Sequence, residues 1–355
     1  MNHSRRIQII PSCTNILGLV TDLLKRFLAA LLAFSPLIVV LGTATVVEAG
    51  SKCLTVEVIK RERMFEGTTA FLDNSGSTPR IVECDATGNT VWEYPLPVHI
   101  QPETRFANDL EWLPDQDHFL FTSRGRGVYE VNRDKSIVWS YNTSKASHDA
   151  DRLPNGNTIF VWGNDTESDA QITEINPGGE IVWQWIGRPH LAGEHRYETP
   201  KGRRQPYSYT HANAVTRLPS GNTLASFRNF HMVVEVNPNG DIVWKLANLP
   251  RVHDPNVLPN GNLLLSLFAQ RSYHPIREVT RSGEVVWEYS EPDLQFSTSV
   301  ARLANDNVLV AGRNMIVEVT REKEVVWRAF LPGVDASPDS QQRYLFKVVR
   351  IPAQK

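Results

Sequence analysis

The sequence predicts an all-β fold, a six-bladed β-propeller built from four-stranded antiparallel blades. An apolar strand that ends in tryptophan occurs six times, at spacings of 47, 44, 61, 43 and 40 residues. A second phrase, Leu-Pro before a polar turn, keeps the same period, as at residues 153–157 and 258–262. Self-similarity near this length with several short strands per repeat is typical of β-propellers. The tryptophans, which we expect to pack between blades rather than to stack on a cofactor, are Trp92, Trp139, Trp183, Trp244, Trp287 and Trp327.

Residues 148–185 show the strand order within one repeat. The first strand covers 148–153, and Asn155-Gly156-Asn157 form a hairpin turn that favours positive φ. Three further strands are expected at 158–162, 171–176 and 180–185. Each repeat therefore predicts one blade of four antiparallel strands.

The two ends of the repeat region complement each other. The first repeat has only three evident strands, at 67–73, 80–85 and 90–94, whereas residues 344–351 form a strand without a repeat of its own. We expect this last strand to complete the first blade, because that closes the ring and removes its open sheet edges.

The charge balance argues against two classes of partner. Lys and Arg number 37 and Asp and Glu number 39, so the formal net charge is −2. This balance favours neither a nucleic acid nor an anionic membrane surface as the ligand.

Residues 1–49 differ in composition from the repeats. Lys25 and Arg26 precede an uncharged run at 27–47, and Val47-Glu48-Ala49 has the pattern of a cleavage site. We expect a signal peptide or, as the alternative, a membrane anchor. Either reading places the propeller at 50–355 outside the cytoplasm, in the periplasm or the extracellular space, with only the N-terminal segment meeting a membrane.

Cys53 and Cys84 lie outside this segment. In an oxidising compartment they are able to form a disulfide that ties the start of the propeller to its first blade. Two unrelated buried thiols are the alternative.

The predicted topology separates two rims. The stereotyped Asn-Gly-Asn and Pro-Gly-Gly turns lie on one rim, and the starts of the first strands lie on the other, with the loops that join strands two and three. Because irregular loops on a rigid scaffold usually carry function, the second rim is the candidate site.

Polar residues recur five positions before the leucine of each Leu-Pro phrase. A first strand that lines the central channel would there present Asn108, His148, Asn213, His253 and Thr298. His211 precedes Asn213 by two residues, so strand alternation is expected to place both on one face. Asp149 and Asp254 follow their histidines directly and are expected to point away and to bond between blades. Arg228 lies on the same rim, and these residues predict one polar cluster.

One insertion interrupts the period at 186–210. It is rich in basic residues, so we expect a lid over the polar rim that attracts an anionic ligand. A solvated loop is the alternative. The basic residues are Arg188, His190, His195, Arg196, Lys201, Arg203 and Arg204.

Four phrases carry a resemblance to a known family. They are Ser147-His148-Asp149, Thr210-His211-Ala212-Asn213, Ser226-Phe227-Arg228 and Val252-His253-Asp254 with their Leu-Pro turns. Together they resemble the bacterial arylsulfate sulfotransferases. Those enzymes are exported six-bladed propellers that move a sulfuryl group from a phenolic sulfate ester to another phenol without a nucleotide donor.

The resemblance implies roles for individual residues. His253 is similar to the histidine that accepts the sulfuryl group, and His148, His211 and Arg228 are similar to the groups around the sulfate. Asn213 and Thr298 would form a polar second rank. Arg271 and Tyr273, on the rim loop of the fifth blade, are expected to bind substrate, and Tyr273, Phe227 and Phe230 are candidates for holding the aryl ring.

Such a reaction fits the side chains and requires neither a metal nor an organic cofactor. A neutral imidazole can attack sulfur, a guanidinium can stabilise the sulfuryl oxygens, and a second, cationic histidine can stabilise the phenolate. The expected partners are an aryl sulfate donor and a phenolic acceptor.

Two other classes of function remain open at this point. One is a metal-dependent hydrolase or lactonase propeller that uses His148, His253 and rim carboxylates such as Asp165. The other is a non-catalytic propeller that binds an anionic ligand through its basic loop.

Overall fold

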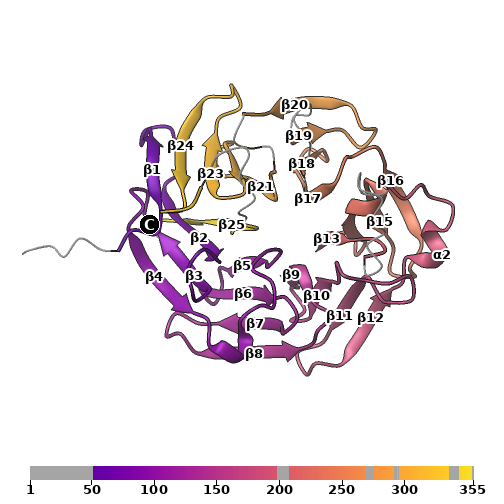
Figure 1. Ribbon diagram of the computed structural model, residues 1–355. Helices are drawn as coiled ribbons and strands as arrows, with labels where there is room; N and C mark the ends of the chain where they lie inside the picture. The colour runs from indigo at the N-terminus through magenta and orange to yellow at the C-terminus, as the bar shows by residue number, and fades with distance from the viewer. Residues whose placement is uncertain are drawn as a thin grey trace, which may run out of the picture. The chain divides into compact units, whose positions relative to one another are not determined.

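Six sheets surround a central axis in the computed structural model (Figure 1). The structure describes residues 51–197, 208–268, 275–291, 294, 296–335 and 344–353. Gly50–Lys355 is one compact unit. The predicted all-β, six-bladed propeller is confirmed.

Each blade pairs its strands in sequence order from the centre outward, except where the chain ends are used. The blades are: blade 1, β25 (Val348–Pro352), β2 (Gly67–Asp73), β3 (Arg80–Cys84) and β4 (Thr90–Pro95); blade 2, β5 (Leu110–Leu113), β6 (His118–Ser123), β7 (Gly127–Val131) and β8 (Ile137–Asn142); blade 3, β9 (Ser147–Arg152), β10 (Thr158–Val161), β11 (Ile172–Ile175) and β12 (Ile181–Trp185). They continue with blade 4, β13 (Ala212–Arg217), β14 (Thr223–Phe227), β15 (Met232–Val236) and β16 (Ile242–Leu246); blade 5, β17 (Val252–Val257), β18 (Leu263–Leu267), β19 (Ile276–Val279) and β20 (Val285–Tyr289); and blade 6, β21 (Ser299–Arg302), β22 (Val308–Ala311), β23 (Met315–Val319), β24 (Val325–Phe330) and β1 (Thr55–Ile59). Short helical turns lie at η1 (Val98–Ile100), α2 (Arg188–Leu191) and η2 (Arg228–Phe230).

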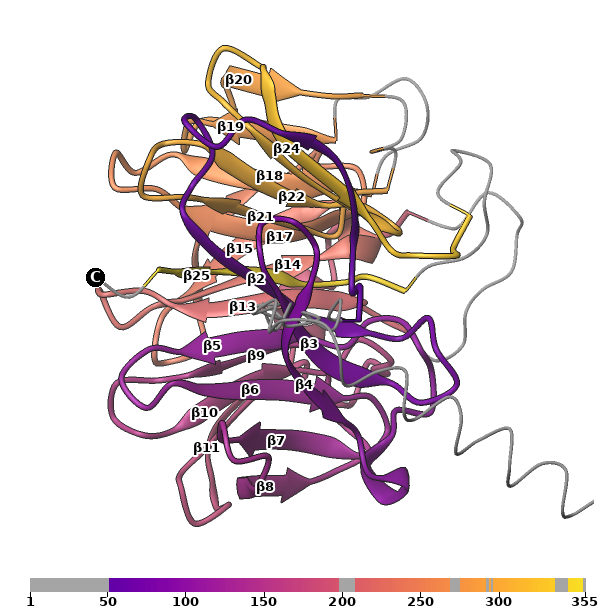
Figure 2. The same cartoon turned by 90° about the vertical axis from the view of Figure 1, so that its left-hand side faces the viewer.

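The C-terminal strand closes the ring as the sequence predicts. β25 pairs antiparallel with β2, from Gly67 opposite Pro352 to Phe71 opposite Val348. It supplies the innermost strand of blade 1, beside β2 in the side view (Figure 2). The first blade is therefore built from both ends of the propeller sequence.

A second closing strand was not predicted. β1 pairs antiparallel with β24 and gives blade 6 a fifth, outermost strand. Its Val56 packs on the apolar cluster that contains Trp327. The disulfide Cys53–Cys84 lies next to this strand, with the two Cα atoms 6.1 Å apart, and joins the start of the propeller to blade 1.

The six repeat tryptophans link neighbouring blades, as predicted. Each indole N–H donates a hydrogen bond to a backbone carbonyl in the next blade around the ring. The last of them, Trp327, closes the circle by donating to Ala86 of blade 1. The six acceptors, at 2.8–3.1 Å and in the order of the tryptophans, are Arg133, Pro177, Pro238, Arg281, Arg321 and Ala86.

The targeting segment predicted at 1–49 lies outside the described residues. In the ranges that are described, no helix has the length and apolarity that crossing a membrane requires.

Candidate active site

The structure brings together four of the residues singled out in the sequence, which we call the histidine cluster: His148, His211, His253 and Arg228. The ring centroids of His148 and His211 are 5.0 Å apart, and Arg228 Nη1 lies 3.1 Å from His211 Nε2. Both His148 and His253 contact Phe346, at centroid distances of 5.7 and 6.1 Å. Blades 3, 4 and 5 thus each contribute a histidine to one place.

β-Bulges present these histidines. In β9 the register shifts between Ala150 and Ser147, so His148 and Asp149 fall in a bulge. In β17 the shift between Val252 and Pro255 places His253 in the same way. Bulges re-aim side chains and are common beside active sites.

His211 reaches the cluster by a different route from the one predicted. It precedes β13, and the register shifts again at Asn213, so strand alternation does not apply here. Its φ is 50°, and that of His148 is 63°; non-glycine residues rarely adopt these left-handed values. Backbone conformation, rather than strand periodicity, orients these two rings.

Hydrogen bonds define the tautomer of His211. Ser208 Oγ donates to the Gly163 carbonyl at 2.9 Å and therefore accepts a proton from His211 Nδ1, at 2.7 Å. The lone pair on Nε2 then accepts the N–H of Arg228. His211 is a neutral ring that orients the guanidinium.

A backbone carbonyl defines which nitrogen of His253 carries a proton. Its Nδ1 lies 2.9 Å from the carbonyl of Arg251, which can only accept, so Nδ1 is protonated. When this ring is neutral, its lone pair is on Nε2, the position a nucleophilic imidazole requires.

His148 is held by its neighbour and by the facing strand end. Ser147 Oγ accepts the N–H of Gly163 at 3.0 Å and lies 2.7 Å from His148 Nδ1. This contact fixes the orientation of the imidazole ring. Gly163 is needed here because a Cβ at this position would lie 2.4 Å from the imidazole.

The cluster is electrostatically positive. Burial lowers the pKa of His148 well below its usual value, and the nearby charge of Arg124 adds to this effect. Burial, followed by Arg228, lowers the pKa of His211 in the same way. Both shifts favour neutral rings at neutral pH, so neither ring suits the cationic role expected of a second histidine.

Arg124 is a member of this environment that sequence reasoning did not single out. It follows β6 as Arg228 follows β14, so the two arginines occupy equivalent places in blades 2 and 4. Its backbone N–H is bonded to Asn108, at 2.9 Å, and its Nη2 to Asn164, at 2.6 Å. Comparing the first residue after each second strand would have found it.

Aromatic side chains border the cluster. Phe268 stacks on His253 with centroids 5.1 Å apart and lies 5.2 Å beneath the guanidinium carbon of Arg228. Phe346 also meets Phe106 edge-on at 5.4 Å. Phe296 continues this surface, 4.6 Å from Phe268.

The four residues predicted to bind substrate are Asn213, Thr298, Arg271 and Tyr273, and the structure describes the first two of them. Asn213 donates to the Val252 carbonyl at 2.9 Å. Its Oδ1 and the Oγ1 of Thr298 are buried and make no hydrogen bond within the described part of the chain. Arg271 and Tyr273 lie outside the described residues.

Phe227 and Phe230 were wrong as candidates for holding an aryl ring. Phe227 is fully buried and stacks on Trp185 at 5.2 Å, because it ends a core strand of blade 4. Phe230 is buried against Tyr209. Both belong to the apolar core between blades 3 and 4.

The insertion at 186–210 is described except for 198–207. In the described part, Arg196 donates to the Ser208 carbonyl at 2.8 Å and lies over Tyr209, and Arg188 approaches Glu167 at 3.7 Å. Arg196 therefore supports the segment that bears Ser208, the partner of His211.

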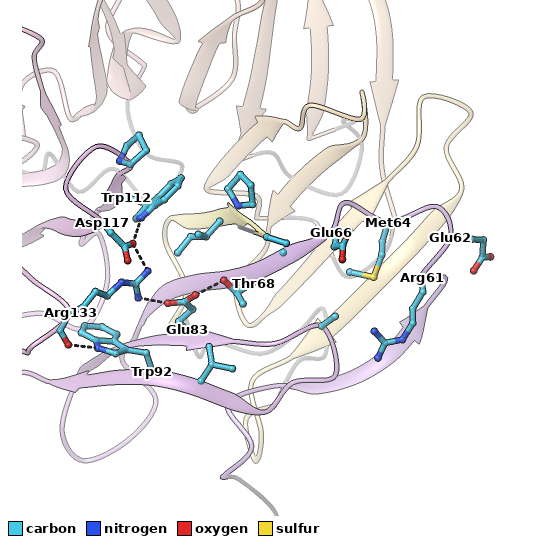
Figure 3. Close-up of a pocket in the computed structure, with 17 residues that line it drawn as sticks. Arg61, Glu62, Met64, Glu66, Thr68, Glu83, Trp92, Trp112, Asp117 and Arg133 are labelled. Atoms are coloured by element: carbon cyan, nitrogen blue, oxygen red, sulfur yellow. Dashed lines mark hydrogen bonds and ion pairs between the residues drawn. The ribbon is translucent and has the colours of Figure 1, made fainter. Parts of the chain in front are cut away.

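A cavity of about 1260 Å³ lies on the opposite rim, between blades 1 and 2. Figure 3 shows three of its charged side chains joined to one another: Arg133 bonds to Glu83 and Asp117, and Asp117 also accepts from Trp112. Its lining includes no member of the histidine cluster. These polar groups bond the two blades together.

No three His, Cys, Asp or Glu side chains are arranged to hold a metal ion in the part of the chain that the structure describes.

Comparison with protein families decides the assignment. The family model of arylsulfotransferases (ASST) matches residues 55–254, which is 200 of the 355 residues. The chain belongs to the arylsulfotransferase family. The match spans every residue of the histidine cluster and ends one residue after His253. No curated protein matches the sequence.

Solved structures support the fold. A protein of unknown function from Bacteroides caccae is similar at a TM-score of 0.54 and 20% identity, covering 74% of this chain and 93% of its own. A streptogramin B lyase is similar at a TM-score of 0.50 and 12% identity, covering 81% and 91%. At these identities the likeness concerns the propeller alone.

Proposed function

We propose that this arylsulfotransferase-family protein transfers a sulfuryl group from a phenolic sulfate ester to an acceptor hydroxyl, through a sulfo-histidine on His253. One observation carries the proposal: three imidazole rings and the guanidinium of Arg228, contributed by three blades, lie close together. Family membership supports the reaction class.

The first step requires a nucleophile with an available lone pair. His253 Nε2 attacks the sulfur atom, the N–S bond forms, and the bond from sulfur to the phenolic oxygen breaks. The electron pair of that bond leaves with the phenolate. The Nδ1–H bond to Arg251 holds the ring in the tautomer that this step needs.

Charge stabilisation then falls to the arginines. The sulfuryl group spreads negative charge over its oxygens, and donors fixed in place stabilise such a group without reorganising. His211 holds the guanidinium of Arg228, while Arg124 adds a second positive charge near His148. The imidazole of His148 lies beside them and contributes a further polar group.

In the second step the acceptor oxygen attacks sulfur and the N–S bond breaks, which restores the lone pair of His253. The acceptor loses its proton to solvent, and this proton balances the phenolate released earlier. Asn213 Oδ1 and Thr298 Oγ1, buried acceptors without a partner among the described residues, are suited to orient a substrate hydroxyl.

The aromatic border supports an aryl substrate. Phe268 and Phe346 contact the histidines directly, and flat apolar rings pack favourably in stacked or edge-on geometry. They replace Phe227 and Phe230 as the residues proposed to hold the phenol.

Turnover with a chromogenic aryl sulfate tests the proposal. The full chain should release phenolate faster when a phenolic acceptor is added, and His253→Asn should abolish release. His118→Asn is the matched control, because His118 of β6 pairs with Glu130 of β7, outside the cluster. Hydrolysis that a chelator stops would favour the metal-dependent alternative, and binding of aryl sulfate without turnover would favour the binding module.

Export of the protein is a separate proposal. It rests on the composition of residues 1–49 and on the Cys53–Cys84 disulfide, a bond that persists in oxidising compartments. Fractionation of cells that express the full chain should recover the propeller outside the cytoplasm, and recovery in the cytosol would refute it.

A further inference from the structure

The C-terminal strand brings a partly buried lysine to the centre of the ring. Lys347 directly precedes β25, and its ammonium group lies among three carboxylates: two on inner strands and one on the residue before β5. The distances from Nζ are 3.2 Å to Asp149, 3.6 Å to Asp254 and 3.8 Å to Asp109. One residue from the C-terminal strand therefore contacts blades 2, 3 and 5.

Each of these aspartates also bonds to the next blade. Asp149 accepts the Val215 N–H at 2.7 Å, and Asp254 accepts the Val300 N–H at 3.1 Å. Asp109 accepts the Ala150 N–H at 3.2 Å. The carboxylates fix how neighbouring inner strands meet.

Two of the aspartates share their bulges with catalytic candidates. Asp149 follows His148, and Asp254 follows His253, so each pair occupies one register shift. A carboxylate fixed on the far side of such a bulge limits how the histidine on the near side can turn. Phe346, the residue before Lys347, touches both histidine rings.

We propose that Lys347 is a positioning residue of the active site: its charge holds the central aspartates in place, and they fix the bulges of His148 and His253. Closure of the ring by the last strand then completes the catalytic centre as well as the fold. This inference rests on the proposed function only for its kinetic readout.

The surroundings of Lys347 favour this role over direct chemistry. Burial opposes its charge, but Asp149, Asp254 and Asp109 raise the pKa of Lys347 well above its usual value. It stays an ammonium ion and is no nucleophile. It also lines a cavity of about 480 Å³ that opens beside the Leu-Pro turns and includes no residue of the histidine cluster.

Removing the ammonium group leaves carboxylates that repel one another. Burial and neighbouring carboxylates already raise the pKa of Asp109 and of Asp149, so the charged forms lose further stability without Lys347. In Lys347→Met we expect the bulges to shift and kcat to fall about tenfold to a hundredfold, with KM for the donor changing much less. Lys347→Arg, which keeps the charge, should recover part of this loss. Lys145→Met is the control, because Lys145 makes an exposed pair with Asp169.

Histidine NMR gives a readout that does not depend on the reaction. In Lys347→Met the ring signals of His148 and His253 should move while those of His118 stay in place. If the wild type transfers no sulfuryl group, the proposed function fails, and this arm still tests the role of Lys347. Unchanged ring signals in a folded Lys347→Met protein would overturn the inference.

A second variant keeps the test decisive if Lys347→Met does not fold. Lys347→Met with Asp254→Asn removes one unbalanced charge and retains an oxygen that can accept the Val300 N–H. This double variant should fold. The ring signals of His148 and His253 should move from their wild-type positions, but less far than they would in an unfolded protein. Wild-type signals and wild-type kcat in this double variant would show that Lys347 positions nothing.

Discussion

At the residue scale, the chemistry of the cluster depends on histidines that stay neutral. His148 is buried and His211 is partly buried, both lie near guanidinium groups, and desolvation and charge both disfavour an added proton. A neutral ring can orient Arg228 through its lone pair, which a protonated ring cannot do.

This arrangement predicts a pH dependence of stability. The folded-state pKa of His148 is lowered, so below the unfolded value of about 6.5 the unfolded chain binds a proton that the native protein excludes. Folding stability should therefore decrease as the pH is lowered through that range. Relative to His148→Gln, urea denaturation should show the wild type gaining about 1 kcal/mol of unfolding free energy per pH unit as the pH rises from about 5 to 6.5. A difference that does not vary with pH would contradict the neutral assignment.

The close approach of Gly163 to His148 gives a second residue-scale prediction. The backbone of Gly163 accepts any residue, but the added methyl group of Gly163→Ala would overlap the imidazole. We expect a loss of about 1–3 kcal/mol in unfolding free energy and a marked fall in kcat. Gly193→Ala is the matched control, since a Cβ there meets no atom within 4 Å. Equal activity of the two variants would show that His148 need not keep its place.

The sequence located the cluster because the Leu-Pro phrase gives each blade a common origin. His148 and His253 stand out at equivalent positions, and Arg228 follows from the family pattern. Arg124 was missed because arginine in a rim loop is unremarkable until the strand ends are aligned. Phe346 and Lys347 were missed because they arrive from the C-terminal strand, with no repeat to compare.

At the element scale, a tryptophan, a glutamate and an arginine recur together in every blade. Glu83, for example, lies opposite Trp92 in the β3–β4 pair and binds Arg133 of blade 2, whose guanidinium lies over the indole. The apolar period revealed the tryptophans. The backbone carbonyls that accept the indole N–H groups lie in the next blade. They could not be predicted from a single repeat, because they depend on how neighbouring blades are placed around the ring.

These indole bonds predict a regular energetic effect. Trp139→Phe removes the bond to the Pro177 carbonyl, at 3.0 Å, and retains an aromatic ring beneath Arg152. We expect a loss of about 1 kcal/mol in unfolding free energy. Trp244→Phe should cost a similar amount, and the two losses should add because the sites lie in different blades. Chemical denaturation measures both, and a double variant as stable as the wild type would exclude a role for these bonds.

Bulges and an extra strand mark the limit of prediction at this scale. The sequence has the right residues in β9 and β17, but a register shift depends on pairing with the next strand. β1 alternates Val56 and Val58 with polar residues, yet it lies before the first repeat and was not assigned.

At the scale of the whole molecule, the ring is closed where blade 6 meets blade 1. β25 joins β2 and β1 joins β24, so both ends of the propeller chain contribute to closure. Arg350 of β25 pairs with Glu318 of β23 and lies over Trp327. The sequence predicted the first of these contacts and left the disulfide open.

The disulfide should matter for the stability of this seam. Cys53 and Cys84 are 31 residues apart, and a cross-link across such a loop restricts the unfolded chain. The variant Cys53→Ser with Cys84→Ser should lose about 2–4 kcal/mol in unfolding free energy. A reductant should lower the wild type to the same level and leave the variant unchanged. Equal stability of oxidised wild type and variant would refute this role.

The central claim is that His253 carries the sulfuryl group between donor and acceptor. The most direct measurement stops the full-length protein during turnover of an aryl sulfate and maps the modified peptide by mass spectrometry. We predict one sulfuryl group on His253, present without acceptor, lost on adding a phenol and absent in His253→Asn. A protein that turns over with an unmodified His253, or with the group on another residue, would contradict it.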